Sequence, residues 1–399
     1  MTGIRTVKEN PWLLPAGIDE VLPQEARQLE TLRRKLLDLY DSWGYELVIP
    51  PMIEYLESLL TGTGSDLDLQ TFKLIDQLNG RMMGVRADMT PQVARIDARR
   101  LATEAPTRLC YMGTVLHTRP DGFAGSRSPY QVGAELYGHA GPQSDAEILS
   151  LLLETLKITG SNDVYLDLGH VGIFRGLSQQ IGLSAEQETQ LFDMLQRKAL
   201  PEIEAYLQAL DVKRGFKQML SALAVLNGDA GVLDEARRML KPAGKAVIAL
   251  IDYLEEVASL LERAVPGIPL HYDLAELRGY RYQTGIVFAA FVPGHGQEIA
   301  RGGRYDDIGV VFGRARAATG FSTDLRSLIK LAALPATRKK AVLAPAGGAA
   351  GLYAAVAQLR AGGERVIHEL PGQRGNAEDL GCDRRLVQKN GQWVVVAIK

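Results

Sequence analysis

Two neighbouring stretches carry cationic and phenolic side chains whose spacing could line a ligand site. From Arg278 onward, large side chains alternate through Tyr282 to Phe288, and a period of two predicts a strand with one bulky face. Proline and glycine at 293–296 predict a turn, after which the sequence Arg-Gly-Gly-Arg-Tyr ends at Tyr305. Glycine in this returning strand would let a ligand approach the backbone. An ordinary antiparallel hairpin would produce the same pattern, so the residues alone leave both interpretations open.

A single glutamate on a predicted strand is a second candidate for chemistry. Glu135 shares one face of the strand with Gln131, while its chain neighbours on both sides are apolar. A carboxylate buried among such residues needs a cationic or hydrogen-bonding partner. The pattern therefore indicates either a ligand amine at Glu135 or a structural ion pair with Arg127.

Asp88 and Thr90 form a third candidate group, where a predicted hairpin leads into a predicted helix. Asn79-Gly80 is a strong signal for the turn of that hairpin. Thr90 followed by Pro91 is typical of a helix N-cap and first helical position, which would place free backbone N–H groups beside Asp88. A purely structural capping role is the alternative interpretation for Thr90.

The elements that must position these groups follow from periodicity. Leucines at helical spacing predict a helix over 24–43, which Gly44 ends. A strand is predicted over 45–51, with paired prolines at its end because proline cannot donate to a ladder. Two further strands are predicted over 107–119 and 130–138, joined by a flexible loop.

The composition predicts a folded protein of two or three domains without a bulk electrostatic preference. The chain has 399 residues, of which 46% are hydrophobic, and its 45 Lys and Arg nearly balance 47 Asp and Glu. Cys110 and Cys382 lie far apart and form no CxxC pair. We therefore expect no disulfide framework, metal or cofactor, and a cytoplasmic protein. No uncharged run in the sequence reaches membrane-spanning length.

Several dispersed motifs, taken in order, resemble the catalytic core of the histidyl-tRNA synthetases, a class II aminoacyl-tRNA synthetase family. The resemblance implies an α+β domain over 1–330, in which a six- or seven-stranded antiparallel sheet is flanked by helices. It also implies a homodimer built through the first motif. The matching residues are Gly44-Tyr-Glu46 with Pro50, Arg86-Ala-Asp-Met-Thr90, Gln131 with Glu135, Arg278-Gly-Tyr-Arg-Tyr-Gln-Thr-Gly285, Gly302-Gly-Arg-Tyr-Asp306 and Gly320-Phe321.

The chain departs from that family at two arginines that clamp ATP. Counting without a gap from Gly113 to Glu135 places His117 where the resemblance implies an arginine facing the α-phosphate. The third motif should end in Glu-Arg, but the corresponding pair is Arg326-Ser327. Neither a histidine nor a serine supplies the cationic fork that matches a phosphate. Unless Arg326 serves after a register shift, the loss of both clamps argues against adenylate formation.

Two other regions bear on function. A helical segment over 176–265 corresponds in the synthetases to an insertion that touches tRNA, but here it carries ten basic against thirteen acidic residues. A phosphate-binding surface should be basic, so this balance argues against tRNA binding. Residues 338–399 predict a small α/β domain, with strands over 340–345 and 393–398 and a helix over 347–360.

A synthetase-like chain that keeps part of the amino-acid site and lacks the ATP clamps resembles the regulatory subunits of ATP phosphoribosyltransferase. That resemblance implies a chain without catalytic activity, which activates the short-form catalytic subunit in a hetero-octamer of four regulatory and four catalytic chains. It further implies feedback inhibition by histidine in the first step of histidine biosynthesis. Histidine would act by binding one arrangement of the assembly more tightly than another.

The same resemblance assigns a histidine pocket by position. Glu135 and Asp88 would meet the α-amino group, and Arg278 would face the carboxylate. Gln131 and Thr90 would add hydrogen bonds, and Tyr305 would border the imidazole. The full set of expected histidine-binding residues is Asp88, Thr90, Arg127, Gln131, Glu135, Arg278, Tyr282 and Tyr305.

Two alternatives from other functional classes stay open at this level. A divergent histidyl-tRNA synthetase would catalyse histidine-dependent pyrophosphate exchange. A free-standing module that binds histidine or tRNA would have no catalytic partner.

Overall fold

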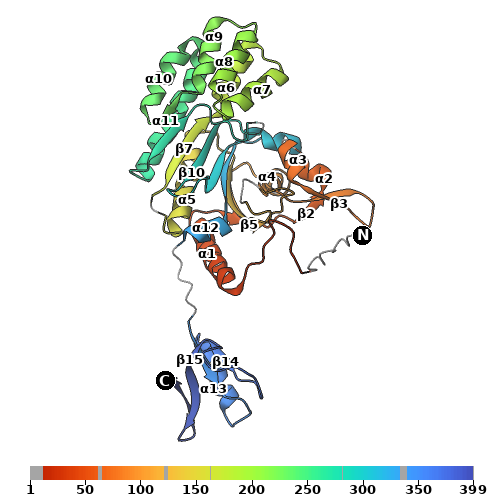
Figure 1. Ribbon diagram of the computed structural model, residues 1–399, viewed down its shortest axis with the longest axis vertical. Coiled ribbons are helices and arrows are strands. Elements are labelled where there is room, and N and C mark those ends of the chain that lie inside the picture. Colours follow the sequence, from red (N-terminus) through yellow and green to blue (C-terminus); the bar gives the residue numbers. More distant parts are fainter. Residues whose placement is uncertain are drawn as a thin grey trace, which may run out of the picture. The chain divides into compact units, whose positions relative to one another are not determined.

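The structure is a computed structural model that describes residues 12–61, 65–120, 125–161, 163–280, 282–332 and 339–398 (Figure 1). The chain separates into two compact units, Met1–Leu334 and Pro335–Lys399. The large unit contains all of the predicted ligand-binding residues. Arg281 and the loop residues 121–124, which belong to predicted elements, lie outside the described residues.

A mixed sheet forms the centre of the large unit. Among the described residues it has nine strands, in the order β1-β5-β6-β12-β11-β10-β7-β9-β8. The six strands from β5 to β7 in this order are antiparallel to their neighbours, while β1 pairs with β5 and β9 pairs with β7 in parallel. The expected six-stranded antiparallel core is therefore confirmed and is extended at both edges. The strands are β1 (Glu46–Leu47), β5 (Thr107–Thr114), β6 (Tyr130–Tyr137), β7 (Tyr165–His170), β8 (Asn227–Gly228), β9 (Leu270–Asp273), β10 (Ile286–Phe291), β11 (Ala300–Arg304) and β12 (Ala318–Asp324).

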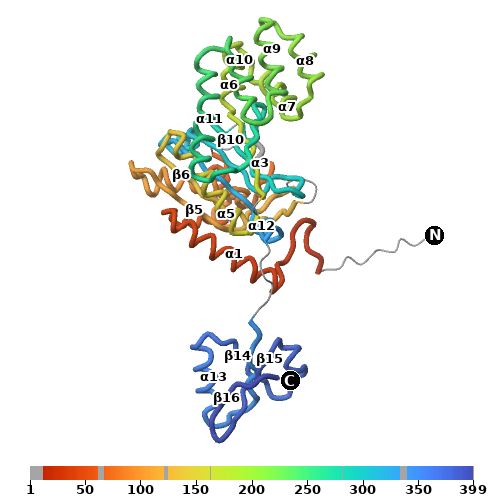
Figure 2. The backbone as a smooth tube through the Cα atoms, turned by 90° about the vertical axis from the view of Figure 1, so that its left-hand side faces the viewer, coloured from red at the N-terminus to blue at the C-terminus, as the bar shows by residue number. Residues whose placement is uncertain are grey.

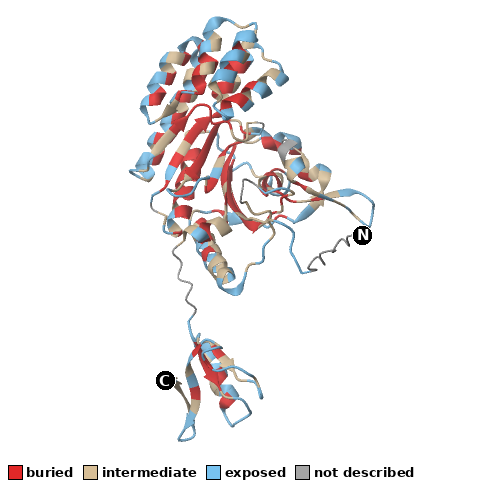
Figure 3. Cartoon of the chain, viewed as in Figure 1, coloured by how far each residue is buried: buried red, intermediate tan, exposed pale blue. Residues whose placement is uncertain are grey.

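Helices cover one face of this sheet. The helix predicted over 24–43 is confirmed as α1 (Pro23–Ser42), and it packs with α5 (Pro142–Ile158) and α12 (Leu325–Leu331). Their leucines bury the sheet residues Val132, Ala134 and Phe321 in one continuous hydrophobic core. Burial of this apolar surface is the main favourable term in folding such a unit. Figure 3 shows that the buried residues concentrate in the sheet and on the helix faces that cover it.

The opposite face of the sheet carries the polar candidates. The helix α4 (Thr90–Ile96) lies on this face, followed by the π-helical turn η1 (Asp97–Leu101), and η3 (Asp306–Phe312) packs against both. A second, smaller hydrophobic cluster joins Met89, Val93 and Phe312 to Tyr111 and Tyr305 of the strands. Side chains at alternate strand positions therefore face either the large core or this polar side.

A small sheet of three described strands stands beside the central sheet. It is ordered β2-β4-β3 and includes the hairpin predicted around Asn79-Gly80, where Gly80 has a φ of 72°. A positive φ at glycine carries no steric cost, which explains the turn. The elements are β2 (Ile53–Tyr55), β3 (Phe72–Ile75), β4 (Met82–Val85), α2 (Leu56–Leu60) and α3 (Ser65–Gln70).

Helices between β7 and β9 form the segment that the sequence marked over 176–265 (Figure 1). Lys198, whose φ of 50° breaks the helix, separates two of these helices, α7 and α8. The helices are α6 (Val171–Ile181), α7 (Ala185–Gln196), α8 (Leu200–Ala209), α9 (Arg214–Leu223), α10 (Gly231–Leu240), η2 (Lys241–Ala243) and α11 (Lys245–Ala264).

Two predicted strands are shorter than expected. Of the strand predicted over 45–51, only β1 is formed, because the prolines at 50 and 51 end the ladder. The strand predicted to start at Arg278 begins only at Ile286. The intervening residues form turns instead, in which Gly279 O accepts hydrogen bonds from the backbone N–H groups of Tyr282 and Gln283. The turn predicted at 293–296 and the return strand β11 are present.

The C-terminal unit is a small α/β sandwich, seen as the blue part of Figure 2. In its described part the strands are ordered β14-β13-β15-β16, and the central strand β13 is parallel to both neighbours. Its helix starts at Leu352 rather than at 347, because glycines precede it. The elements are β13 (Ala341–Ala344), α13 (Leu352–Ala361), β14 (Val366–His368), β15 (Cys382–Lys389) and β16 (Gln392–Ala397).

Two absences concern only the residues that the structure describes. Within them, no helix is long and apolar enough to cross a membrane. The same residues contain no cluster of three His, Cys, Asp or Glu side chains placed to hold a metal ion.

Candidate ligand-binding site

The centre of the site is the carboxylate of Glu135 on β6, which is only 1% exposed. Three hydroxyl groups donate hydrogen bonds to it. Tyr111 OH on β5 lies 2.8 Å from Oε1, Thr90 Oγ1 lies 3.1 Å from the same oxygen, and Tyr305 OH donates to Oε2. The prediction that Thr90 caps the helix is wrong, since Met89 occupies that position and the Thr90 hydroxyl is bonded to Glu135.

Strand register and two glycines make room for this carboxylate. Gly320 on β12 is the Cα partner of Glu135, and a Cβ at Gly320 would lie 1.5 Å from Glu135 Oε2. Likewise, a Cβ at Gly133 would lie 2.3 Å from the hydroxyl of Tyr111. The two glycines therefore provide the space that a larger residue would fill.

Burial controls the electrostatics of the site. It raises the pKa of Glu135 to about 8, against the lowering effect of the hydrogen bonds from Tyr305 and Tyr111. Burial, followed by the charge of Glu135, also raises the pKa of both phenols well above the usual range. Among the described residues, no lysine or arginine pairs with Glu135. The site therefore presents a buried acceptor that a ligand cation could neutralise.

Asp88 and Gln131 form a second polar group on the same side of the sheet. Gln131 Nε2 donates to Asp88 Oδ1 over 2.7 Å, and Gln131 Oε1 accepts the backbone N–H of Met89 over 2.9 Å. The backbone N–H of Thr90 donates to Asp88 Oδ1 over 3.0 Å, which confirms the prediction that free N–H groups at the helix start lie beside Asp88. This network holds the segment before α4 against β6.

Tyr282 stands close to these groups although it is 41% exposed. Its ring packs against Gly279, at which a Cβ would come within 2.8 Å. Burial of the phenol raises its pKa, and the nearby carboxylate of Asp88 adds to the effect. The structure therefore brings together Asp88, Thr90, Gln131, Glu135, Tyr282 and Tyr305 of the predicted set.

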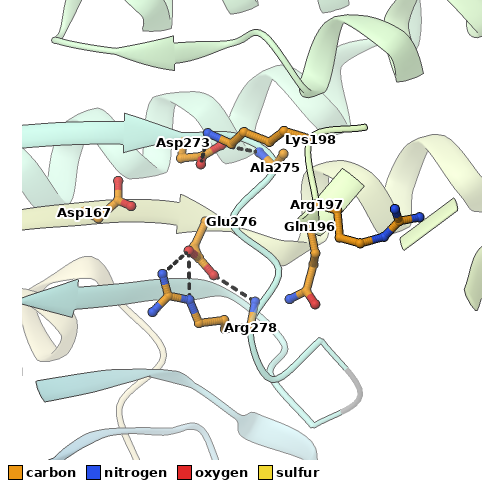
Figure 4. A pocket seen from close by; sticks show the side chains of 8 residues that line it. All are labelled: Asp167, Gln196, Arg197, Lys198, Asp273, Ala275, Glu276 and Arg278. Carbon is orange, nitrogen blue, oxygen red and sulfur yellow. Dashed lines mark hydrogen bonds and ion pairs between the residues drawn. The ribbon is translucent and has the colours of Figure 1, made fainter. Parts of the chain in front are cut away.

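Arg278 belongs to a different environment. Its Nε lies 3.1 Å from Glu276 Oε2, and its Nη1 lies 2.9 Å from Glu298 Oε2. It lines a polar cavity of about 530 Å³ between the α7–α8 connection and the sheet edge (Figure 4). The residues around this cavity are Asp167, Gln196, Arg197, Lys198, Asp273, Ala275, Glu276 and Arg278, and Glu135 is not among them.

Arg127 also lies apart from Glu135. Its Nε donates to His117 O over 3.0 Å, and its Nη1 donates to Ala16 O over 3.1 Å. The ion pair between Arg127 and Glu135 that the sequence left open is therefore wrong. Arg127 instead joins the segment before α1 to the segment that follows β5, because its guanidinium bridges two backbone carbonyls.

Comparisons with known proteins agree along the whole chain. The histidyl-tRNA synthetase family profile matches residues 17–328, and the profile of the C-terminal domain of the ATP phosphoribosyltransferase subunit HisZ matches residues 339–396. An ATP phosphoribosyltransferase regulatory subunit of Thioalkalivibrio sulfidiphilus is 64% identical over 97% of this chain and 98% of its own length. The ATP phosphoribosyltransferase regulatory subunit of Pseudomonas aeruginosa PAO1 is 55% identical over 97% of this chain and 98% of its own length.

This chain belongs to the ATP phosphoribosyltransferase regulatory subunit family. It therefore has a regulatory role in histidine biosynthesis. Solved structures agree on the fold. An ATP phosphoribosyltransferase regulatory subunit/histidyl-tRNA synthetase from Bacillus halodurans superposes with a TM-score of 0.80 at 24% identity, covering 94% of this chain and 96% of its own. A histidyl-tRNA synthetase from Nostoc superposes with a TM-score of 0.76 at 21% identity, covering 98% of this chain and 97% of its own.

His117 and Ser327, the positions at which we expect the ATP-clamping arginines to be missing, both have partners within the protein. His117 is buried, and its Nε2 lies 2.9 Å from Ala87 O. Ser327 Oγ donates over 2.9 Å to Asp324, whose carboxylate also accepts the first free N–H groups of α12. Neither position supplies a cation for a phosphate, which accords with a regulatory rather than a catalytic chain.

Sequence reasoning missed Tyr111, whereas Gln283 is part of the motif over 278–285. Tyr111 donates the 2.8 Å hydrogen bond to Glu135, and Gln283 lies over Gly303 on the neighbouring strand. A signal for Tyr111 was present, because alternation puts residues 109, 111 and 113 on one face of their strand. That face lies on the same side of the sheet as Gln131 and Glu135 of the paired strand. The period of two predicted a strand at Gln283, but this residue lies in the turns before β10.

Proposed function

We propose that this chain activates the short-form ATP phosphoribosyltransferase catalytic subunit and that histidine reverses the activation by binding around Glu135. The observation that carries the proposal is the environment of this carboxylate, which is buried and accepts hydrogen bonds from three hydroxyls, with no cation from the described part of the chain. Such a group is costly to ionise alone and is stabilised by an incoming ammonium or imidazolium. Histidine carries both kinds of group.

The neighbouring residues support an amino-acid ligand. Asp88 and Gln131 add acceptor and donor atoms beside Thr90, and the phenols of Tyr282 and Tyr305 border the same space. Arg278 would face the ligand carboxylate only after it releases one of its two glutamates. Arg127 would contribute indirectly, by holding the segment around His117 in place.

The proposed assembly is a hetero-octamer of four regulatory and four catalytic chains in the cytoplasm, built on a regulatory homodimer. An exposed apolar strip at the sheet edge supports the dimer. Leu47 of the edge strand β1 is exposed, as are Ile49, Met52 and Ile53 that follow it. Edge strands and contiguous apolar residues are common sites of association. The acidic balance of the helical segment over 176–265 supports the absence of tRNA from this assembly.

Reconstitution tests the proposed function. The purified chain is mixed with a short-form catalytic subunit, and turnover of ATP and phosphoribosyl pyrophosphate is followed with and without histidine. We expect activation by the wild-type chain that histidine reverses. We also expect Glu135→Gln to activate equally well while requiring at least about tenfold more histidine for inhibition, because it removes the buried charge. Absence of both complex and activation, together with histidine-dependent pyrophosphate exchange, would instead identify a divergent synthetase.

A further inference from the structure

Gln283 has a buried amide oxygen without a partner. The residue is 4% exposed, and its Oε1 accepts no hydrogen bond from any residue that the structure describes. The backbone around it is fixed, because its N–H donates to Gly279 O over 2.8 Å and its carbonyl accepts from Arg175 Nη2 over 3.0 Å. The backbone that carries the unpartnered oxygen is therefore held in place.

The strand register puts this oxygen next to Glu135. A Cβ at Gly303 would lie 2.7 Å from Gln283 Oε1, and a Cβ at Gly320 would lie 1.5 Å from Glu135 Oε2. Gly303 and Gly320 are Cα partners on the antiparallel strands β11 and β12. Side-chain positions on such partners are roughly 5 Å apart. Two acceptor oxygens thus stand over two adjacent glycines on one face of the sheet.

The two acceptor oxygens of Glu135 and Gln283 favour a nitrogen group of the ligand that donates hydrogen bonds. A carboxylate and an amide oxygen both accept hydrogen bonds, and neither attracts a ligand carboxylate or phosphate. Two acceptors that stand over neighbouring strand positions can share a group that donates in two directions, because each N–H···O hydrogen bond is about 2.9 Å long. The amide stays neutral at every pH, so it adds an acceptor beside Glu135 without adding a second negative charge.

We propose that Gln283 Oε1 accepts an N–H of the bound amino acid whose cationic nitrogen group lies between Gln283 and Glu135, and that Gln283 thereby determines which ligand the chain accepts. This inference rests on the proposed function, since it takes the pocket around Glu135 as the ligand site. An unpaired buried acceptor destabilises the ligand-free fold, and the bound ligand removes that cost. Gln283 is thus a residue that favours binding at the expense of stability.

Substitution by a side chain of similar size without an acceptor tests this trade-off. In Gln283→Met, we expect histidine affinity, measured by calorimetry, to fall about tenfold, as for loss of one hydrogen bond to a cation. We expect the Tm of the ligand-free chain to stay equal or rise, because the unpaired oxygen is gone. Gln297→Met, at an exposed position of the β10–β11 turn, is the matched control and should leave both values unchanged.

Ligand analogues then identify the nitrogen. Imidazolepropionate lacks the α-amino group, and the two ring-methylated histidines each lack one ring N–H. The analogue that lacks the recognised donor should bind wild type and Gln283→Met equally, whereas the other analogues should keep the tenfold ratio. Equal histidine affinity of wild type and variant, or a lower Tm of the variant, would overturn this role of Gln283. A wild-type chain that binds no histidine would overturn the proposed function together with it.

Discussion

Arg278 Nη1 lies 2.9 Å from Glu298 Oε2, so the arginine that the sequence assigned to a ligand carboxylate already binds a carboxylate of its own chain. Glu298 Oε1 also lies 3.5 Å from Arg301 Nη1 of β11. Glu276 Oε2 accepts a hydrogen bond from Arg278 Nε over 3.1 Å. Glu298 belongs to the segment that joins β10 and β11, which turns at 293–296. A ligand carboxylate would therefore compete with this segment for the same guanidinium.

Glu298→Gln should strengthen histidine binding if Arg278 contributes to the pocket. Removing the charge of the competing carboxylate frees one side of the guanidinium, and we expect roughly a threefold to tenfold gain in affinity, within the range for a partly exposed charged hydrogen bond. Calorimetry of the purified chain measures this gain. Glu256→Gln on the exposed side of α11 is the control. An unchanged affinity would mean that Arg278 takes no part in holding the ligand.

Histidine binding should release a proton from Glu135. Because the pKa of this buried carboxyl is about 8, it is largely protonated at pH 7, and a ligand cation would favour its ionised form. We expect the release of up to one proton per site, measured by calorimetry in buffers of different ionisation enthalpy. Glu135→Gln should abolish the release. A release that survives in this variant would have to come from another group.

The same pKa makes stability depend on pH. The folded carboxyl keeps its proton up to about pH 8, whereas the unfolded one loses it near 4.5. Between these values the folded chain binds more protons, so the contribution of Glu135 to stability falls as pH rises. We therefore expect the difference between the Tm of Glu135→Gln and the Tm of wild type to shift in favour of the variant as the pH rises from 5 to 8. A constant difference in Tm would show that Glu135 ionises normally.

Gly320→Ala should disrupt the site from the neighbouring strand. The added methyl group would meet Glu135 Oε2 at 1.5 Å and Ala134 O at 2.7 Å. We expect a loss of about 1–3 kcal/mol in the free energy of unfolding, as for other overpacked interiors, with weakened histidine binding. Denaturant unfolding measures the first and calorimetry the second. Gly296→Ala, where the added Cβ meets open space, should change neither.

The buried pair of Arg304 and Asp145 should be a larger determinant of stability. Arg304 Nη2 and Nε lie 2.9 and 3.1 Å from the two Asp145 oxygens, and both side chains are buried. Asp145→Ala would leave the partly exposed Asp306 as the one carboxylate paired with the buried guanidinium among the described residues, so we expect a loss of roughly 3–5 kcal/mol in denaturant unfolding. Glu202→Ala, which breaks the exposed pair with Arg197, should have no measurable effect.

The exposed apolar strip after β1 is where we expect the proposed homodimer to form. Ile49 is 80% exposed, and charge at this position should prevent two apolar strips from packing. We expect Ile49→Asp to convert the dimer into a monomer in light scattering without lowering its Tm by more than the loss of the dimer contact explains. Leu78→Asp, exposed at the hairpin turn of the small sheet, is the control. A variant that remains dimeric would place the dimer surface elsewhere.

Much of the fold was already determined by local sequence. The leucine spacing gave the range of α1 to within one residue at each end, and Asn79-Gly80 marked a hairpin that the structure contains. Alternation along β6 correctly put Gln131 and Glu135 on one face. These features depend on residues a few positions apart, so periodicity and turn chemistry are sufficient to find them. The expected loss of the ATP-clamping arginines at His117 and Ser327 stays a prediction from the sequence.

Only the tertiary structure decided which side chains meet. Tyr305 and Glu135 are 170 residues apart, and their hydrogen bond depends on the order in which β6, β12 and β11 pair. Arg278 and Arg127 have types and positions suited to a ligand, yet the fold gives them Glu298 and backbone carbonyls as partners. Local patterns specify the face on which a residue lies, but long-range register and burial specify its partner and therefore its charge state.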